Sequence, residues 1–127
     1  MAARLEHANI TVTDIDRTAG YLNGIFGWEV RWDGASIHNG RSVHIGTGDQ
    51  YVALYTGPGK PTEGPSSYTT IGGINHLGVV VDDLDATEQK VKDAGFEPHS
   101  HADYEPGRRF YFHDHDGVEI ECVEYDA

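Results

Sequence analysis

The stretch LEHANITVTDIDRT at residues 5–18 returns later in the chain as INHLGVVVDDLDAT at residues 74–87. When the two stretches are aligned, His7 falls on His76, and the aspartate-rich ends of the two stretches also coincide. A repeat of this length indicates one duplicated supersecondary unit rather than a solenoid, which stacks many shorter units. A pseudo-two-fold repeat brings matching positions toward its axis. The repeat therefore decides the fold and shows where to look for a site.

The first copy predicts a strand, a helix and three further strands. Residues 5–12 alternate between the two faces of a half-buried strand. Asp14 or Asp16 can cap the following helix by accepting a hydrogen bond from its free amides, and Gly27 can end it. The strands that follow are expected at residues 28–33, 41–47 and 50–56, separated by glycine-containing turns.

The second copy predicts the same elements in the same order. A strand at 74–82 precedes a helix near 85–94, in which Leu84, Val91 and Ala94 are expected to face inward. The remaining strands are expected near residues 96–100, 108–113 and 118–124, the last two joined by a turn at 114–117.

Each copy is therefore predicted to be a βαβββ module. The modules span about residues 4–56 and 74–125, and the glycine- and proline-rich segment 57–73 links them. One small sheet leaves one of its faces open, so two modules must pair. The expected fold is α+β, with the paired sheets forming a cupped, partly open β-barrel and the helices outside.

Composition narrows the range of functions. The 127 residues are 38% hydrophobic and 24% charged, which is typical of one ordinary globular domain. A net charge of −12 argues against nucleic-acid binding, and no apolar run is long enough for a membrane span. The single cysteine, Cys122, is typical of a reducing compartment, and no signal-peptide pattern is present. We expect a cytoplasmic protein that binds neither nucleic acid nor membrane.

The two copies and the segment RFYFHDHDGVEIE at 109–121 resemble the vicinal oxygen chelate superfamily. This superfamily includes glyoxalase I, extradiol dioxygenases, fosfomycin-resistance transferases and bleomycin-binding proteins. Its metal ligands come from the first and fourth strands of each module. Carried over to this chain, those positions are His7, Ala53, His76 and Glu121. Alanine cannot bind a metal, so the resemblance implies three ligands and argues against a glyoxalase I-like site.

Two imidazoles and one carboxylate form a facial triad, which leaves several positions open on a divalent metal. Such a site favours Fe(II), because substrate and O2 can both coordinate, and it also suits Mn(II), Zn(II) or Ni(II). His7 shares its strand face with Asn9 and Thr11, a polar row unlike a core-facing stripe. The alternative is a family member that has lost its function and keeps these residues by chance or for packing.

Two further residues are candidates for proton transfer. Tyr111 lies ten residues before Glu121, and a short turn between their strands lets both face one cavity. Extradiol dioxygenases and fosfomycin transferases both carry a tyrosine here; the alternative is a cross-strand packing residue. His113 shares a face with Tyr111 and is a candidate acid or base.

The sequence therefore predicts a divalent-metal enzyme that acts on a small substrate with vicinal oxygens, with dioxygenase-like chemistry leading. One alternative is a non-enzymatic protein that binds an aromatic or antibiotic ligand. Another is a metal-dependent transferase or lyase of the fosfomycin-resistance kind. The expected partners are a small-molecule substrate or ligand and a second copy of the chain in a homodimer.

Overall fold

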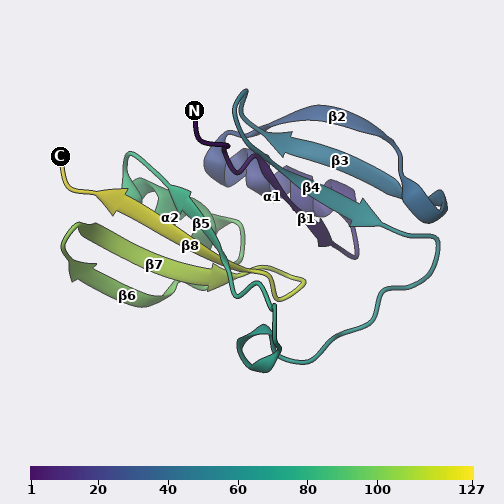
Figure 1. Cartoon of the computed structure of the whole chain (residues 1–127). Coiled ribbons are helices and arrows are strands. Elements are labelled where there is room, and N and C mark those ends of the chain that lie inside the picture. The colour runs from purple at the N-terminus through teal and green to yellow at the C-terminus, as the bar shows by residue number, and fades with distance from the viewer. The chain divides into compact units, whose positions relative to one another are not determined.

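The computed structural model describes residues 1–127 and divides into two units, Met1–Thr62 and Glu63–Ala127. Each unit holds one helix and one four-stranded sheet, and no strand of one sheet pairs with a strand of the other (Figure 1). The α+β class and the two tandem βαβββ modules predicted from the repeat are confirmed.

The first unit follows the predicted element order. Its elements are β1 (His7–Thr11), α1 (Ile15–Phe26), β2 (Glu29–Ala35), β3 (Arg41–Gly46) and β4 (Tyr51–Thr56), with a short 3-10 turn at Ile37–Asn39. The sheet order is β1-β4-β3-β2, in which β1 runs parallel to β4 and the other pairs are antiparallel. Because β1 pairs with β4, the first and last strands of the module lie side by side.

Local signals in the sequence set the bounds of α1. The Asp14 carboxylate accepts a hydrogen bond from the Arg17 amide at 3.1 Å and caps the helix. Gly27 ends it with φ of 71°, a left-handed conformation that glycine adopts without steric cost. Leu22 and Ile25 are buried on the side of α1 that packs on β3 and β4. These contacts leave the opposite face of the sheet for other residues.

The second unit repeats this construction. Its elements are β5 (Leu77–Val80), α2 (Leu84–Asp93), β6 (His99–Tyr104), β7 (Gly107–His113) and β8 (Glu119–Tyr125), in the sheet order β5-β8-β7-β6. Asp83 caps α2 as Asp14 caps α1, and the fully buried Val91 belongs to the helix that contacts β7 and β8.

The end of α2 departs from the prediction. Ala94, expected to face inward, is exposed, because the helix ends at Asp93 and the chain turns back through Gly95 with φ of 92°. The Phe96 amide then donates to the Val91 carbonyl, and the Phe96 ring stacks on Phe112 at 5.5 Å. Phe96 thus closes the core at this end, and β6 begins only at His99 rather than at residue 96.

An ion pair between sheet and helix recurs in both units. Arg41 in β3 binds Asp16, in the first turn of α1, at 3.0 Å, and Arg108 in β7 binds Asp85, in the first turn of α2, at 3.3 Å. Each arginine also binds a second carboxylate, on Asp33 and Glu124 respectively. The duplication therefore extends beyond the apolar pattern to surface contacts, each of modest strength.

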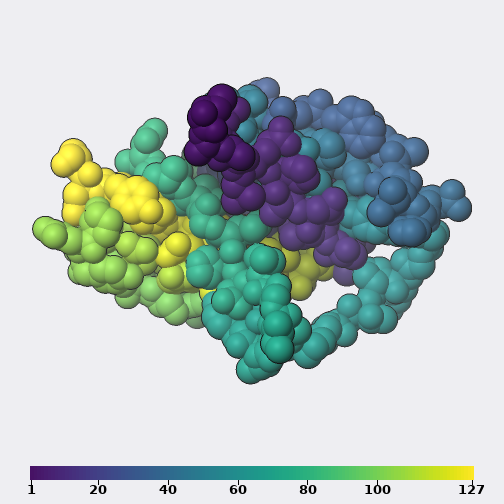
Figure 2. Space-filling model, in the orientation of Figure 1, coloured from purple at the N-terminus to yellow at the C-terminus, as the bar shows by residue number.

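Residues 57–73 join the two sheets and contain a short 3-10 helix at Ser67–Thr69. Most of these side chains are exposed, and Figure 2 shows the teal chain that follows β4 as a narrow segment. The division between the units falls after Thr62. None of the helices has the length and apolar character needed to cross a membrane.

The turn between β7 and β8 rests on one buried carboxylate. Asp114 is 6% exposed, and its Oδ1 accepts hydrogen bonds from the Asp116 amide at 2.8 Å and the Val118 amide at 3.0 Å. Gly117 completes the turn with φ of 80°. The turn fixes the register of β8 against β7, and hence the position of every residue on β8.

We expect Asp114→Ala to lower the free energy of unfolding by about 1–3 kcal/mol, because two part-buried amides lose their acceptor. Urea denaturation followed by circular dichroism measures this change. Asp114→Asn, which keeps a side-chain acceptor, should lose less, and Asp49→Ala in the exposed turn before β4 should lose little. Equal stability of Asp114→Ala and wild type would contradict this role of the turn.

Candidate functional site

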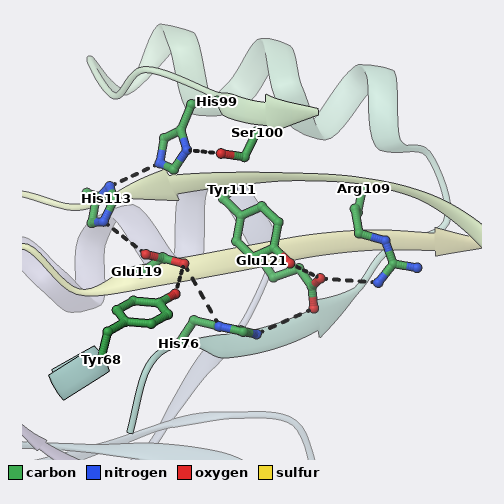
Figure 3. A network of polar contacts seen from close by, with 9 residues as sticks. All are labelled: Tyr68, His76, His99, Ser100, Arg109, Tyr111, His113, Glu119 and Glu121. Carbon is green, nitrogen blue, oxygen red and sulfur yellow. Dashed lines mark hydrogen bonds and ion pairs between the residues drawn. The ribbon is translucent and has the colours of Figure 1, made fainter. Parts of the chain in front are cut away.

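The second unit gathers polar side chains on the face of its sheet opposite α2. Alternate residues of a strand share a face, so the buried Ile120 and Cys122 of β8 place Glu119 and Glu121 on the other side. Figure 3 shows the resulting network. Its members are Tyr68, His76, His99, Ser100, Arg109, Tyr111, His113, Glu119 and Glu121.

One carboxylate oxygen of Glu121 accepts two hydrogen bonds, and the other accepts none. Its Oε2 accepts hydrogen bonds from the Tyr111 hydroxyl at 2.6 Å and from Arg109 Nη1 at 3.2 Å. Its Oε1 lies 3.8 Å from His76 Nε2, too far for a hydrogen bond. Gly78 lies opposite Glu121 in the parallel pair of β5 and β8 and adds no side chain there. One oxygen of Glu121 and one nitrogen of His76 therefore face the same space.

Tyr111 is a hydrogen-bond donor in this arrangement. Its hydrogen bond to Glu121, helped by burial, raises the pKa of Tyr111 to about 12. The phenol therefore keeps its proton at neutral pH. Its ring meets His76 edge-on, with centroids 5.4 Å apart. The structure thus brings together three residues that the sequence singled out: Tyr111, His76 and Glu121.

A second carboxylate, Glu119, was not predicted from the sequence. It accepts a hydrogen bond from the Tyr68 hydroxyl at 2.7 Å and lies 3.1 Å from His113 Nε2 and 3.9 Å from His76 Nδ1. The bond to Glu119 raises the pKa of Tyr68. The signal that could have identified Glu119 is its spacing of two residues from Glu121, which puts both on one face of β8.

His113 meets this network through its ring nitrogens rather than through Tyr111. Its Nε2 faces Glu119, and its Nδ1 lies 3.0 Å from His99 Nε2. His99 Nδ1 in turn lies 2.9 Å from the Ser100 hydroxyl. The shared face predicted for His113 and Tyr111 agrees with the strand pattern, but both ring nitrogens of His113 already have protein partners.

Arg108 and Arg109 point to opposite faces of β7. Arg109 lies on the site face, where it binds Glu121 and its guanidinium carbon lies 4.7 Å from the centre of the Tyr104 ring. Arg108 lies on the helix side and binds Asp85. One arginine therefore adds a positive charge next to the Glu121 carboxylate.

In the first unit, His7 lies on the sheet face opposite α1. Its Nδ1 is 3.0 Å from Glu6 Oε1, and its ring stacks on Tyr51 with centroids 4.8 Å apart. Tyr51 also stacks on His44 at 4.5 Å, and His44 lies 5.0 Å from Trp32. These four rings form an aromatic row across the sheet, which we call the ring row. His7 is therefore placed by stacking as well as by its strand.

Ala53 and Tyr55 lie beside the ring row on the same strand, β4. Ala53, at the fourth equivalent position, is 1% exposed and pairs with Asn9 and His44 across the sheet. Burial lowers the pKa of His44, and the neighbouring His7 and Arg31 add to this effect. Tyr55 points its hydroxyl to the Ile37 carbonyl and fixes that loop.

The donor set can be tested for its fit to a metal ion. Two ligands that each lie about 2.1 Å from one ion can be at most about 4.2 Å apart. The 3.8 Å between His76 Nε2 and Glu121 Oε1 meets that limit. Neither unit by itself brings together three histidine, cysteine, aspartate or glutamate side chains around one point. The pair therefore fits a metal but needs a further ligand.

Several solved structures share this fold. A glyoxylase/bleomycin resistance protein/dioxygenase domain from Frankia sp. EAN1pec is 21% identical, with a TM-score of 0.83 over 99% of this chain and 94% of that chain. The fosfomycin resistance protein FosX from Listeria monocytogenes, complexed with Mn(II) and sulfate ion, is 18% identical, with a TM-score of 0.73 over 99% and 95%. TnmS3, an antibiotic binding protein from Streptomyces sp. CB03234, is 18% identical, with a TM-score of 0.73 over 98% of each chain.

At these identities the likeness shows a common fold and not a common activity. No curated protein matches the sequence at a significant level. A family model, described as the glyoxalase/bleomycin resistance protein/dioxygenase superfamily, matches residues 4–122. Since the match spans nearly the whole repeat, the chain belongs to the glyoxalase/bleomycin resistance protein/dioxygenase superfamily.

Proposed function

We propose that the protein is a divalent-metal enzyme whose ligands are His7, His76 and Glu121. The observation that carries this proposal is the pair of open donors, His76 Nε2 and Glu121 Oε1, that face each other at 3.8 Å. His7 supplies the third donor from the first unit, and its Nδ1 contact with Glu6 leaves Nε2 available. The substrate is a small molecule with two adjacent oxygens.

A metal held by these residues would supply Lewis-acid polarisation of a substrate oxygen or, as Fe(II), redox chemistry with O2. Tyr111 orients Glu121 by its short hydrogen bond and offers a phenolic proton next to the reacting centre. Arg109 balances the carboxylate charge and can attract an anionic substrate group. His113 acts indirectly, through Glu119, which lies 3.1 Å from its Nε2.

Dioxygenase-like chemistry with Fe(II) is the leading reaction. A set of two histidines and one carboxylate leaves enough open positions for substrate and O2 together. FosX has been solved with Mn(II), which supports Mn(II) and transferase or lyase chemistry as one alternative. Consumption of O2 on addition of a catechol distinguishes the two, since the alternative needs no O2.

A second candidate function is ligand sequestration without catalysis. The specific observation in its favour is the ring row of His7, Tyr51, His44 and Trp32, which can meet a planar aromatic ligand. TnmS3, which shares the fold, is an antibiotic binding protein. We further propose that the protein works as a homodimer in the cytoplasm.

Metal analysis tests the ligand set. We expect anaerobically purified wild-type protein to hold one metal ion per chain, and Glu121→Gln and His7→Ala to lose most of it, because each removes one of three donors. Elemental mass spectrometry measures the metal content. His101→Ala is the matched control, since His101 pairs with Glu88 away from these donors and should keep the metal. Full metal content in His7→Ala would remove His7 from the ligand set.

The raised pKa of Tyr111 predicts a pH dependence for the metal-free protein. A group whose pKa is higher in the folded state stabilises that state below its unfolded value of about 10 and loses this effect as pH rises toward 12. The free energy of unfolding should therefore fall between these pH values, and Tyr111→Phe should make the fall shallower. Urea titrations at several pH values measure it. Tyr125→Phe, at an exposed site, should leave the slope unchanged.

Ligand binding separates the enzyme from the sequestering protein. If the metal holds the substrate, catechol should bind tightly to the metal-loaded protein, and its affinity should fall at least about tenfold after a chelator removes the metal. Isothermal titration calorimetry measures both states. Sequestration predicts the opposite pattern: binding that persists without metal and weakens in Tyr51→Leu.

A further inference from the structure

We propose that residues 66–73 form a lid on the sheet face opposite α2, and that the hydrogen bond from Tyr68 to Glu119 holds this lid closed. The lid moves as one piece between the closed position of the structure and an open one. The inference rests on the proposed function only for its purpose, because the covered face is the one that offers His76 and Glu121 to a ligand.

The lid is tied together internally. The Ser66 carbonyl accepts hydrogen bonds from the Thr69 amide at 3.2 Å and from the Thr70 hydroxyl at 2.7 Å. The Gly73 amide donates to the Thr70 carbonyl at 2.9 Å. A Cβ atom at position 73 would clash with the Ser67 carbonyl, so glycine permits this close approach of the chain to itself. The two ends of the lid therefore lie against each other, as in a compact surface loop.

The lid is attached to the sheet at one point. Of the hydrogen bonds made by residues 57–73, one reaches a residue outside this segment: the Tyr68 hydroxyl donates to Glu119 Oε1 at 2.7 Å. The larger side chains of the lid add little to this attachment, because Tyr68 is 61% exposed and Ile71 is fully exposed. A segment with several internal bonds and one external bond detaches more easily than it unfolds.

The chain can bend on both sides of the lid. Residues 57–65 contain three glycines and three prolines and belong to no helix or strand. At the other end Gly72 has φ of 79°, in the left-handed region that glycine adopts without steric cost, and Gly73 follows it. His76 comes three residues later, directly before β5. Rotation at these glycines therefore moves the lid relative to the sheet.

In its closed position the lid covers one end of the site. The Glu119 side chain is 12% exposed, whereas the neighbouring His113 is 51% exposed. The Tyr68 hydroxyl and His76 Nδ1 both lie within 4 Å of Glu119 Oε1 (Figure 3). Opening the lid therefore uncovers Glu119 beside the His76 ring. Lids of this kind admit a ligand when they open and exclude water when they close.

A spin label measures the motion of the lid. Ile71→Cys carries a nitroxide at a fully exposed position, and the buried Cys122 does not compete for the reagent, because burial raises the pKa of its thiol to about 12. Adding Tyr68→Phe should raise the ratio of mobile to immobile label about tenfold, as expected for the loss of one hydrogen bond to a charged group. Tyr125→Phe, which removes a hydroxyl from another exposed tyrosine of this unit, is the matched control.

Carboxylate labelling measures access to the covered face. A carbodiimide couples an amine to exposed carboxylates, and mass spectrometry assigns a rate to each residue. We expect Glu119 to react several-fold faster in Tyr68→Phe than in wild type, because the lid is open for more of the time. Glu88, which is 21% exposed and pairs with His101, should react at the same rate in both proteins.

A more mobile label together with faster reaction of Glu119 is the expected result. Equal label mobility with and without Tyr68→Phe would overturn the role of the hydrogen bond. A more mobile label without faster reaction of Glu119 would overturn the position of the lid over the site.

Hydrogen exchange tests whether the lid moves as one piece. The Thr69 and Gly73 amides, which are bonded within the lid, should exchange at unchanged rates in Tyr68→Phe. Faster exchange of both would show local unfolding in place of a moving lid. All of these readouts use protein without metal or substrate, so a negative result would overturn the lid alone. Absence of metal binding by wild type would overturn the proposed function alone.

Discussion

The two-residue period of β8, with one face buried, is the constraint on which the second unit depends. Ile120 and Cys122 belong to the core, so the carboxylates of Glu119 and Glu121 must point the other way. A slip of one residue would bury both charges and expose the core, which would be very costly. The buried Asp114 in the preceding turn sets this register. Stability and site chemistry thus share one strand.

The site combines two kinds of charge balance. Glu121 is partly neutralised by Arg109 and by the Tyr111 proton, while Glu119 accepts a hydrogen bond from Tyr68 and lies beside two imidazoles. The two carboxylates therefore differ, although they are two residues apart on one face. Glu121 keeps one oxygen open for a ligand, whereas Glu119 is engaged on both of its oxygens.

The sequence predicted the parts of the fold and site that follow from periodicity and from the repeat. The helix start at Asp14, the stop at Gly27 and the shared face of Tyr111 and Glu121 come from such local rules, whereas His76 and Glu121 were singled out by the family resemblance. It missed the contacts of Glu119, because Tyr68 lies in the loop 57–73, whose path no periodicity describes. It missed the His99–His113 pair because a bulge in β6 shifts the register after His99.

The strands of each sheet pair only with one another, and this has a consequence for how the chain can change in evolution. Every strand pair, each of the two helix caps and both arginine–aspartate ion pairs lie within one half of the chain. Each half therefore keeps its own backbone ladder and helix cap, and substitutions in one half leave the ladder of the other intact. Residues 57–73 can change in length without breaking a strand pair, because none of them belongs to a strand.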